Sequence, residues 1–297
     1  MLSILIPVYN FNVIELVKNL NSQAYQAKID FEIIVIDDAS KEKYKIINKQ
    51  VAGIPDVKYF EEKENLGRSK IRNKLADLSS YQYLLFIDCD SQVQNSDYVQ
   101  KYLKFCNSEV VICGGRSYLP DKPANQRYYL RWLHGVRREQ FPAKERNSEP
   151  NKSFMTNNFL ISKTLFNKVR FDETLTNYGH EDTLFGYQLK KNNIIINHID
   201  NPLIHLGLET NEEFIRKTKE GIKNLKQIMR QNGYEKVLIK DITLLHWFKF
   251  MQKLGINRFL RFLFKKSEKN LYNYLVNNKP LLLFFDIYKL GYLCSIN

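Results

Sequence analysis

The chain has 297 residues, enough for one large domain or for one domain with an extension. A composition of 44% hydrophobic and 26% charged residues is typical of a folded protein and excludes a disordered or collagen-like chain. The net charge of +13 suits an anionic partner, but no helix-turn-helix, zinc-finger or RNA-recognition signature accompanies it, so we expect no nucleic acid partner.

Three short apolar runs in the first third of the chain end in polar residues: Ser3 to Tyr9, Phe31 to Asp37 and Tyr83 to Asp88. Helical spacing between them predicts helices from Val13 to Gln23 and from Arg68 to Leu78. Strands that alternate with helices predict an α/β fold with a mixed, mostly parallel sheet flanked by helices. Ligands of such sheets bind beyond the carboxyl ends of the strands.

The pattern loosens from Pro120 to Ser153, in a polar, aromatic and basic region. A strand is then predicted in "FLISKTLF" or its first half, followed by a helix after Glu181 and Asp182 and by the apolar segments "IIINHI" and "PLIHLG". A polar helix from Asn211 to about Gln231 comes next. From Ile239 the sequence changes to Leu, Phe and Trp at helical spacing mixed with Lys and Arg. We place a boundary near Tyr234, which predicts an α/β domain over 1–234 and an α-helical extension over 235–297.

The cysteines, Cys89, Cys106, Cys113 and Cys294, show neither metal-ligand spacing nor a disulfide framework. They predict free thiols in a reducing compartment. The segment "MLSILIPVYN" lacks a basic region followed by a long apolar stretch, so we expect it to be the first strand and not a signal peptide. No uncharged apolar run reaches the length of a membrane span. We therefore expect a cytoplasmic protein.

Acidic residues follow two of the predicted strands. "IDCD" places Asp88 and Asp90 after a buried strand, where carboxylates suit Mg²⁺ or Mn²⁺ held partly by substrate phosphates; ordinary turn chemistry is the alternative. Asp38, in "VIDDAS", can accept a hydrogen bond from a base imide such as that of uracil, or it can cap a helix. In "ENLGRSKIRN", Arg68 and Arg72 suit phosphate or base, or are solvated surface arginines.

A further pair of acids, Glu181 and Asp182, stands behind a Gly-His step in "NYGHED". On this stretch alone, a helix start explains the pair better than catalysis does, because acidic side chains meet unpaired N–H groups and the positive end of the helix dipole there.

Together these segments resemble the family 2 glycosyltransferases of the GT-A fold. The matching pieces are "SILIPVYN", "IIVIDDAS", "NLGRSKIRN", "LLFIDCDS", "FDETLTNYGHED" and "PLIHLG", which extend from about Leu2 to Gly207. The resemblance implies a nucleotide-diphospho-sugar donor, usually linked to UDP, a divalent metal (Mn²⁺ or Mg²⁺) and transfer with inversion. It further implies that Asp38 holds the base near Pro7 and Tyr9, and that Asp88 and Asp90 serve the ribose and the metal.

The resemblance also changes the interpretation of the acidic pair. It implies that Asp182 is the general base and that Glu181 binds the acceptor, a glycan or lipid-linked saccharide, together with Gly179 and His180. His180 stands where many relatives carry a second glycine. His205, in "NPLIHLG", either completes the metal shell, as in several relatives, or is a core histidine.

Two other functions remain open from the sequence. A sugar-nucleotide pyrophosphorylase would need a glycine-rich phosphate loop ending in a cation after the first strand, and "PVYNFNVIEL" has none. A catalytically inactive sugar-binding protein would not need Asp88, Asp90 and Asp182, all of which are present.

The predicted extension is basic and rich in aromatic residues. Residues 236–297 contain 11 Lys or Arg residues against 3 Asp or Glu residues. A stripe at helical spacing, Leu244, Trp247, Phe248, Met251 and Leu254, ends at Gly255, and a second helix is predicted from about Ile256. These helices either pack on the catalytic domain with solvated basic edges or lie on the anionic inner face of a membrane.

Overall fold

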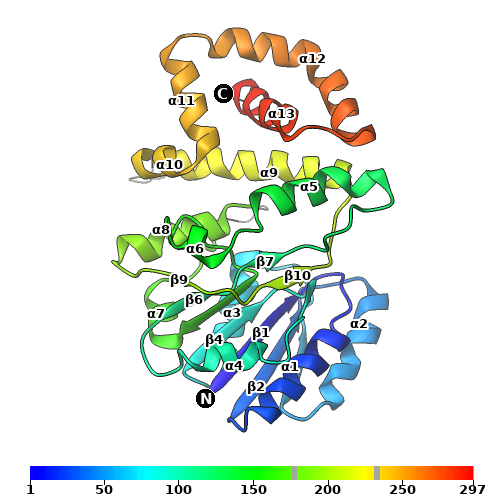
Figure 1. The fold of residues 1–297 in the computed structure, drawn as a ribbon, viewed down its shortest axis with the longest axis vertical. Helices are drawn as coiled ribbons and strands as arrows, with labels where there is room; N and C mark the ends of the chain where they lie inside the picture. Colours follow the sequence, from blue (N-terminus) through cyan, green and yellow to red (C-terminus); the bar gives the residue numbers. More distant parts are fainter. Residues whose placement is uncertain (176–178, 231–234, 297) are drawn as a thin grey trace. The chain divides into compact units, whose positions relative to one another are not determined.

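A computed structural model describes residues 1–175, 179–230 and 235–296 and divides the chain into two compact units (Figure 1). The first unit comprises Met1–Leu119, Glu139–Thr176 and Glu181–Gly207, and the second comprises Pro120–Arg138, Asn177–His180 and Leu208–Asn297. The predicted boundary near Tyr234 lies outside the described residues, so the division into 1–234 and 235–297 stays a prediction.

The first unit is built on a sheet that contains seven strands over the described residues, in the order β3-β2-β1-β4-β8-β6-β9. Strand β8 is antiparallel to both of its neighbours, and the other pairs are parallel. The predicted mixed, mostly parallel sheet is therefore confirmed. The strands are β1 (Leu2–Val8), β2 (Phe31–Asp37), β3 (Val57–Glu61), β4 (Tyr83–Ile87), β6 (Val111–Cys113), β8 (Asn158–Ser162) and β9 (Asn197–His198).

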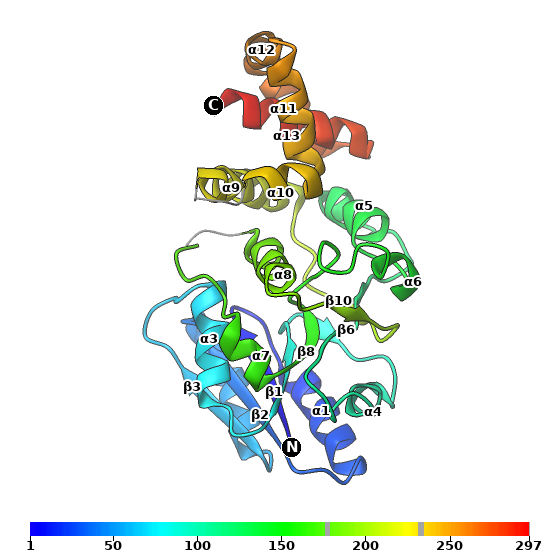
Figure 2. The same ribbon diagram turned by 90° about the vertical axis from the view of Figure 1, so that its left-hand side faces the viewer.

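Helices cover both faces of this sheet, which explains why the central strands are continuous apolar runs (Figure 2). One face packs on α1 (Ile14–Gln26) and α4 (Tyr98–Leu103). The other packs on α3 (Arg68–Leu78), α7 (Lys163–Lys168) and α8 (Glu181–Lys191). Because successive side chains of a strand alternate between faces, Ile4 contributes to the first core and Leu5 to the second.

A second, smaller sheet joins three segments that are far apart in the sequence. It has the order β5 (Ser91–Gln92), β10 (Leu203–His205) and β7 (Arg116–Ser117). Strand β10 is antiparallel to β5, with His205 opposite Ser91, and parallel to β7. The ladder therefore brings the ends of three loops to one place.

The predicted elements agree with the structure to within a few residues. Strand β2 and helix α3 have the predicted bounds, and "FLISKTLF" divides into β8 and α7 after its first half. The short elements that were not predicted from the sequence include α2 (Glu42–Asn48), η1 (Lys49–Gly53), β3, α4 and α6 (Ala143–Arg146). Each of them is short, so it carries little periodic signal.

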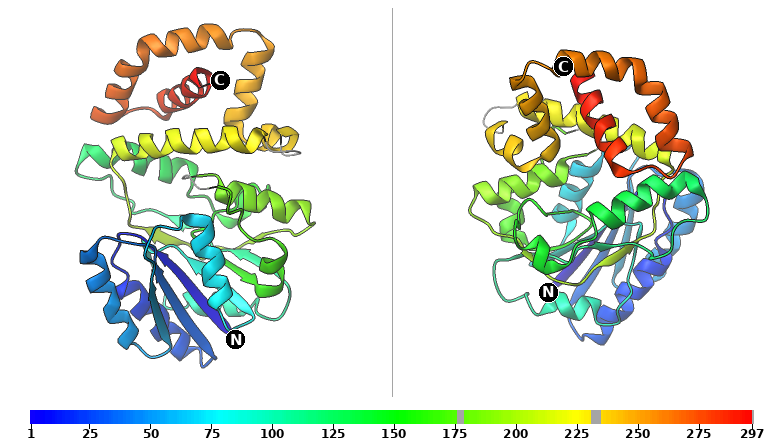
Figure 3. Two further views of the ribbon diagram at one scale, coloured as in Figure 1. Left: turned by 180° about the vertical axis from the view of Figure 1, so that it is seen from behind. Right: turned by 45° about the horizontal axis from the view of Figure 1, so that its top comes forward.

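The second unit is helical over its described residues. It contains η2 (Gln126–Tyr128), α5 (Tyr129–Arg138), α9 (Asn211–Arg230), α10 (Glu235–Asp241), α11 (Thr243–Lys253), α12 (Asn257–Asn277) and α13 (Leu282–Ser295). Helix α12 arches over α13, and Phe264 and Tyr288 meet edge to face at 5.3 Å between ring centroids (Figure 3). Gly255, at φ 73°, stands between α11 and α12 as predicted. Among the described residues, no helix combines the length and the apolar character that crossing a membrane requires.

Helix α8 is anchored to the first unit by aromatic packing. Phe185 stacks on Phe171 at 4.2 Å between ring centroids and also contacts the rings of Phe154, Phe159 and Phe166. It is 1% exposed. The packing fixes the helix whose first turn carries the acidic pair Glu181 and Asp182.

We predict that Phe185→Ala lowers the free energy of unfolding by about 3–5 kcal/mol, because it removes a fully buried ring and leaves a cavity. Chemical denaturation measures the change. Phe60, in the same unit, is 40% exposed, so Phe60→Ala serves as the matched control and should have a much smaller effect. Equal destabilisation by the two substitutions would contradict the assigned role of Phe185.

Candidate functional site

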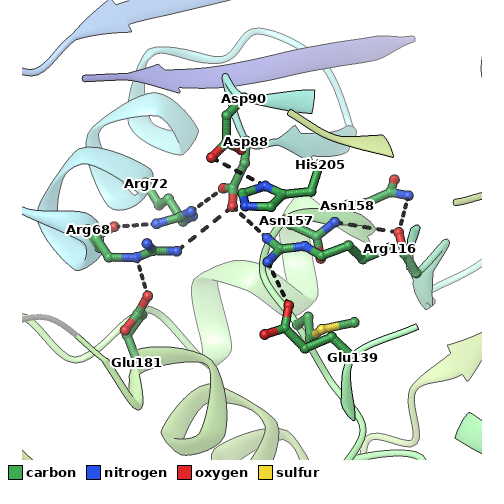
Figure 4. Close-up of polar contacts among 12 residues, drawn as sticks. Arg68, Arg72, Asp88, Asp90, Arg116, Glu139, Asn157, Asn158, Glu181 and His205 are labelled. Carbon is green, nitrogen blue, oxygen red and sulfur yellow. Dashed lines mark hydrogen bonds and ion pairs between the residues drawn. The ribbon is translucent and has the colours of Figure 1, made fainter. Parts of the chain in front are cut away.

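The residues singled out from the sequence meet at the carboxyl edge of the parallel strands. Asp38 follows β2, and Asp88 follows β4. Gly67, at φ 81°, precedes α3, whose first turn carries Arg68. Figure 4 shows side chains from the end of β4 and from α3, β7, β10 and α8 pointing toward one another.

Asp88 is surrounded by arginines. Arg72 Nη2 lies 2.5 Å from Asp88 Oδ1, Arg68 Nη2 lies 3.8 Å from Oδ2, and Arg116 Nη2 lies 3.5 Å from Oδ2 (Figure 4). Arg68 and Arg72 are four residues apart, so they share one face of α3. Arg72 is 3% exposed, which makes its pair with Asp88 a buried one. One carboxylate therefore meets three guanidinium groups within the described residues.

Arg116 was not predicted as a site residue. It stands on β7, and its Nη1 lies 3.2 Å from Glu139 Oε2, an oxygen that also accepts a hydrogen bond from the Tyr118 hydroxyl. Burial opposes the charge of Arg116, but Tyr118, Glu139 and Asp88 outweigh it and hold the pKa of Arg116 above its ordinary value. The sequence signal for this residue was "GGRS" after an apolar segment.

Asp90 and His205 are neighbours. The hydrogen bond from Leu206 N to Asp90 O, at 2.8 Å, extends the β5–β10 ladder and brings His205 Nδ1 to 3.4 Å from Asp90 Oδ2. Burial disfavours the charge of Asp90, but His205, Arg116 and Arg68 outweigh it and hold the pKa of that carboxyl below its ordinary range. Gly207 lies so close that a Cβ there would collide with the Asp90 carboxylate.

Three buried polar atoms of this pair have no hydrogen-bond partner among the described residues: Asp90 Oδ1, His205 Nδ1 and His205 Nε2. An oxygen and an imidazole nitrogen of this kind are ligands for a divalent cation. In the described part of the chain, no group of three or more His, Cys, Asp or Glu residues has metal-binding geometry. The structure thus brings Asp90 and His205 together and pairs Asp88 with arginines, so Asp88 as a metal ligand stays a prediction.

Asp38 has a structural role as well as a predicted one. Its Oδ1 accepts a hydrogen bond from Leu66 N at 2.6 Å and its Oδ2 accepts one from Gly67 N at 3.1 Å. The carboxylate therefore orders the loop before α3, and each oxygen keeps a second lone pair. Burial raises the pKa of Asp38 against the effect of these bonds. Pro7 lies in β1 and Tyr9 follows it, 56% exposed.

The acidic pair begins α8, and its two members differ. Glu181 is 7% exposed and pairs with Arg68. Burial disfavours its charge, but Arg68 and Arg72 outweigh it and lower the pKa of Glu181. Asp182 Oδ1 accepts a hydrogen bond from Thr183 N at 2.7 Å. Burial and the neighbouring charge of Glu181 raise the pKa of Asp182 to about 6.

Gly179 and His180, predicted to bind the acceptor, belong to the second unit. Both adopt positive φ, 97° and 69°. The Gly179 carbonyl accepts a hydrogen bond from Asn224 Nδ2 at 3.1 Å, on helix α9 of the same unit. Their role toward an acceptor stays a prediction.

Comparison with known proteins identifies the family. Residues 3–170 match the sequence profile described as "Glycosyl transferase family 2". The chain belongs to this family. Among curated relatives, the chondroitin synthase of Escherichia coli is 29% identical over 223 residues, which are 63% of this chain and 32% of that protein. The hyaluronan synthase of Pasteurella multocida is 29% identical over 190 residues, 54% of this chain and 19% of that protein. The chain thus spans a third or less of the length of these two relatives.

Solved structures share the fold. The mannosyltransferase PcManGT from Pyrobaculum calidifontis, in complex with GDP-Man and Mn²⁺, superposes with a TM-score of 0.61 at 14% identity, over 99% of this chain and 85% of that one. TarS 1-349 from S. aureus superposes with a TM-score of 0.52 at 18% identity, over 97% of this chain and 89% of that one. The predicted GT-A fold, family and transferase class of this glycosyltransferase are confirmed. A pyrophosphorylase and an inactive sugar-binding protein are not favoured.

We predict that Arg72→Met lowers the free energy of unfolding by about 1.5–3 kcal/mol, because it removes a buried hydrogen bond to the Asp88 carboxylate while Arg68 and Arg116 still compensate its charge. In a double-mutant cycle with Asp88→Asn, the two residues should show a coupling of about 0.5–3 kcal/mol. Chemical denaturation measures both quantities.

The matched control is the exposed pair Arg170 and Asp77, whose side chains are 36% and 58% exposed. Arg170→Met should cost about 1 kcal/mol or less. If Arg72→Met costs no more than this control, the buried pair does not stabilise the site.

Proposed function

We propose that this glycosyltransferase moves a sugar from a nucleotide-diphospho-sugar, with UDP as the nucleotide, to a hydroxyl group of a glycan or lipid-linked saccharide, with inversion. The observation that carries the proposal is the acidic pair that begins α8. Its two carboxyls have opposite pKa shifts, lowered for Glu181 and raised for Asp182. Neighbouring carboxyls whose environments separate their pKa values are a signature of acid–base catalysis.

Asp182 is assigned as the general base. A base works best when its pKa lies near the operating pH, and a value of about 6 allows Asp182 to be ionised at neutral pH yet to accept a proton readily. As the acceptor oxygen attacks the anomeric carbon, its proton passes to the Asp182 carboxylate, and the bond from that carbon to the diphosphate oxygen breaks. Glu181 stays ionised beside Arg68 and orients the acceptor through a hydrogen bond to a neighbouring hydroxyl.

The donor class is supported by the cluster of cations at the sheet edge. Arg68, Arg72 and Arg116 converge on Asp88, and a diphosphate is a dianionic group that guanidinium groups bind well. The solved neighbours include PcManGT with GDP-Man and TarS with UDP and with UDP-GlcNAc, all nucleotide sugars or their product. The choice of UDP depends on Asp38, whose remaining lone pairs can accept the imide N–H of uracil.

A divalent metal, Mn²⁺ or Mg²⁺, fits the residues present. Asp90 Oδ1 and His205 Nε2 are buried and have no hydrogen-bond partner among the described residues, which makes them available as ligands. Two protein ligands suffice where phosphate oxygens and water complete the shell, as is usual for Mg²⁺. The ion would offset the charge that develops on the leaving diphosphate. Of the solved neighbours, PcManGT was determined with Mn²⁺.

We predict that Asp182→Asn binds UDP-sugar and metal normally but loses transfer by a factor of about 10²–10⁴, because the amide keeps the shape and cannot take a proton. For the unmutated chain, the transfer rate should fall as pH decreases through about 6, where Asp182 becomes protonated. A radiolabelled-donor transfer assay measures both effects. Near-normal transfer by Asp182→Asn would contradict the assignment: either the pair only starts the helix, or Glu181 is the base.

We predict that Asp90→Ala abolishes the Mn²⁺-dependent thermal stabilisation by UDP-sugar, and that His205→Ala weakens the metal affinity at least about tenfold while part of the donor affinity remains. A thermal-shift screen of UDP- and GDP-sugars with a Mn²⁺ titration measures this without knowledge of the acceptor. Asp97 is half exposed and forms a pair with Lys101, so Asp97→Ala is the control and should match the unmutated chain. Unchanged metal dependence in the Asp90 and His205 variants would exclude them as ligands.

A further inference from the structure

The second unit carries an exposed apolar surface on α11 and the first half of α12. It consists of Trp247, Phe250, Leu254, Phe259, Phe262 and Leu263, each between 43% and 59% exposed. We call this set the α11–α12 apolar surface. Leu245 and Phe248, on the other side of α11, are buried instead.

The spacing of these residues places them on common faces of their helices. Trp247, Phe250 and Leu254 are separated by three and four residues, so they share one face of α11. Phe259 and Phe262 share a face of α12 in the same way, just beyond the turn at Gly255. Exposed apolar side chains that are scattered singly over a surface are ordinary, whereas several on one helix face mark an interaction site.

Cations accompany the apolar side chains. Lys253, Arg258, Lys265 and Lys266 are exposed, and no acidic residue occurs in the sequence from 242 to 267. Lys266 Nζ lies 4.6 Å from the centroid of the Phe262 ring, so charge and aromatic surface are in direct contact. A binding partner for this surface must therefore combine negative charge with an apolar interior.

We propose that the α11–α12 apolar surface binds an anionic lipid bilayer, with its aromatic and leucine side chains between the acyl chains and its cations at the headgroup phosphates. A basic amphipathic helix with aromatic residues on its apolar face lies in the membrane interface in this way. Charge complementarity selects this occupant. A second copy would bring the same cations against themselves, and a nucleic acid would neutralise the cations but leave Leu254 and Leu263 in water.

The proposal goes beyond sugar transfer, because it concerns where the protein is held and not what it catalyses. Co-sedimentation of the whole chain with vesicles of phosphatidylcholine containing about 30 mol % phosphatidylglycerol tests it, against pure phosphatidylcholine vesicles. The chain should pellet with the anionic vesicles at low salt and be released by high salt. Failure to pellet with anionic vesicles at low salt overturns the proposal.

A variant pair separates apolar insertion from charge alone. The double substitution Phe259→Ser and Phe262→Ser alters exposed side chains, so the fold should persist by circular dichroism, and partition to anionic vesicles should fall at least about tenfold. The matched control, Ile46→Ser and Ile195→Ser, removes two apolar side chains that are 62% and 73% exposed in the first unit, and it should bind as the unmutated chain does.

Tryptophan emission supplies a second readout. The chain has two tryptophans; Trp132 is buried and Trp247 is 48% exposed, so a blue shift on addition of anionic vesicles reports Trp247 entering the bilayer. The shift should be absent in Trp247→Phe. Two results would overturn the proposal. One is binding to RNA that equals vesicle binding and that the double substitution Phe259→Ser and Phe262→Ser leaves unchanged. The other is self-association without lipid that the same variant abolishes.

Discussion

The balance of charge around Asp88 is the constraint on which the rest of the site depends. Its carboxylate is shared by Arg68, Arg72 and Arg116, which come from α3 and β7. These cations would repel one another without an anion between them. Arg68 continues the network to Glu181 on α8. Ion pairs of the same network therefore connect the end of β4 to the start of α3, to the small sheet and to the acidic pair.

This network also explains why two adjacent carboxyls behave differently. Glu181 points toward Arg68 and stays ionised, whereas Asp182, one residue further around the helix, bonds to Thr183 at its own helix start and experiences the charge of Glu181. The position of the helix itself depends on apolar packing, since Phe185 stacks on Phe171 beneath it. Electrostatic interactions determine the protonation states of the two carboxyls, and apolar packing determines where helix α8 lies.

Local signals in the sequence predicted most of the first unit. The run Phe31 to Asp37 and the helix from Arg68 to Leu78 have the predicted bounds because strand burial and helical spacing are both strong there. Arg116 and Glu139 were not predicted, because they pair across 23 positions of the sequence and no local periodic signal reports such a contact. The hydrogen bonds of Asp38 to Leu66 and Gly67 depend likewise on a loop 28 residues away. The exposure of Trp247 and Phe259 could not be read from periodicity, which marks an apolar face but not what covers it.

Two glycines limit how this site can vary. Gly207 lies against the Asp90 carboxylate, and Gly114 lies against Tyr102, Asn158 and the Asn201 carbonyl, so that any Cβ at either position would overlap an atom that cannot easily move. A combinatorial library that seeks a new donor preference should therefore leave both glycines unchanged. Diversity is better introduced at Tyr9, which is exposed and leaves the packing of β1 untouched.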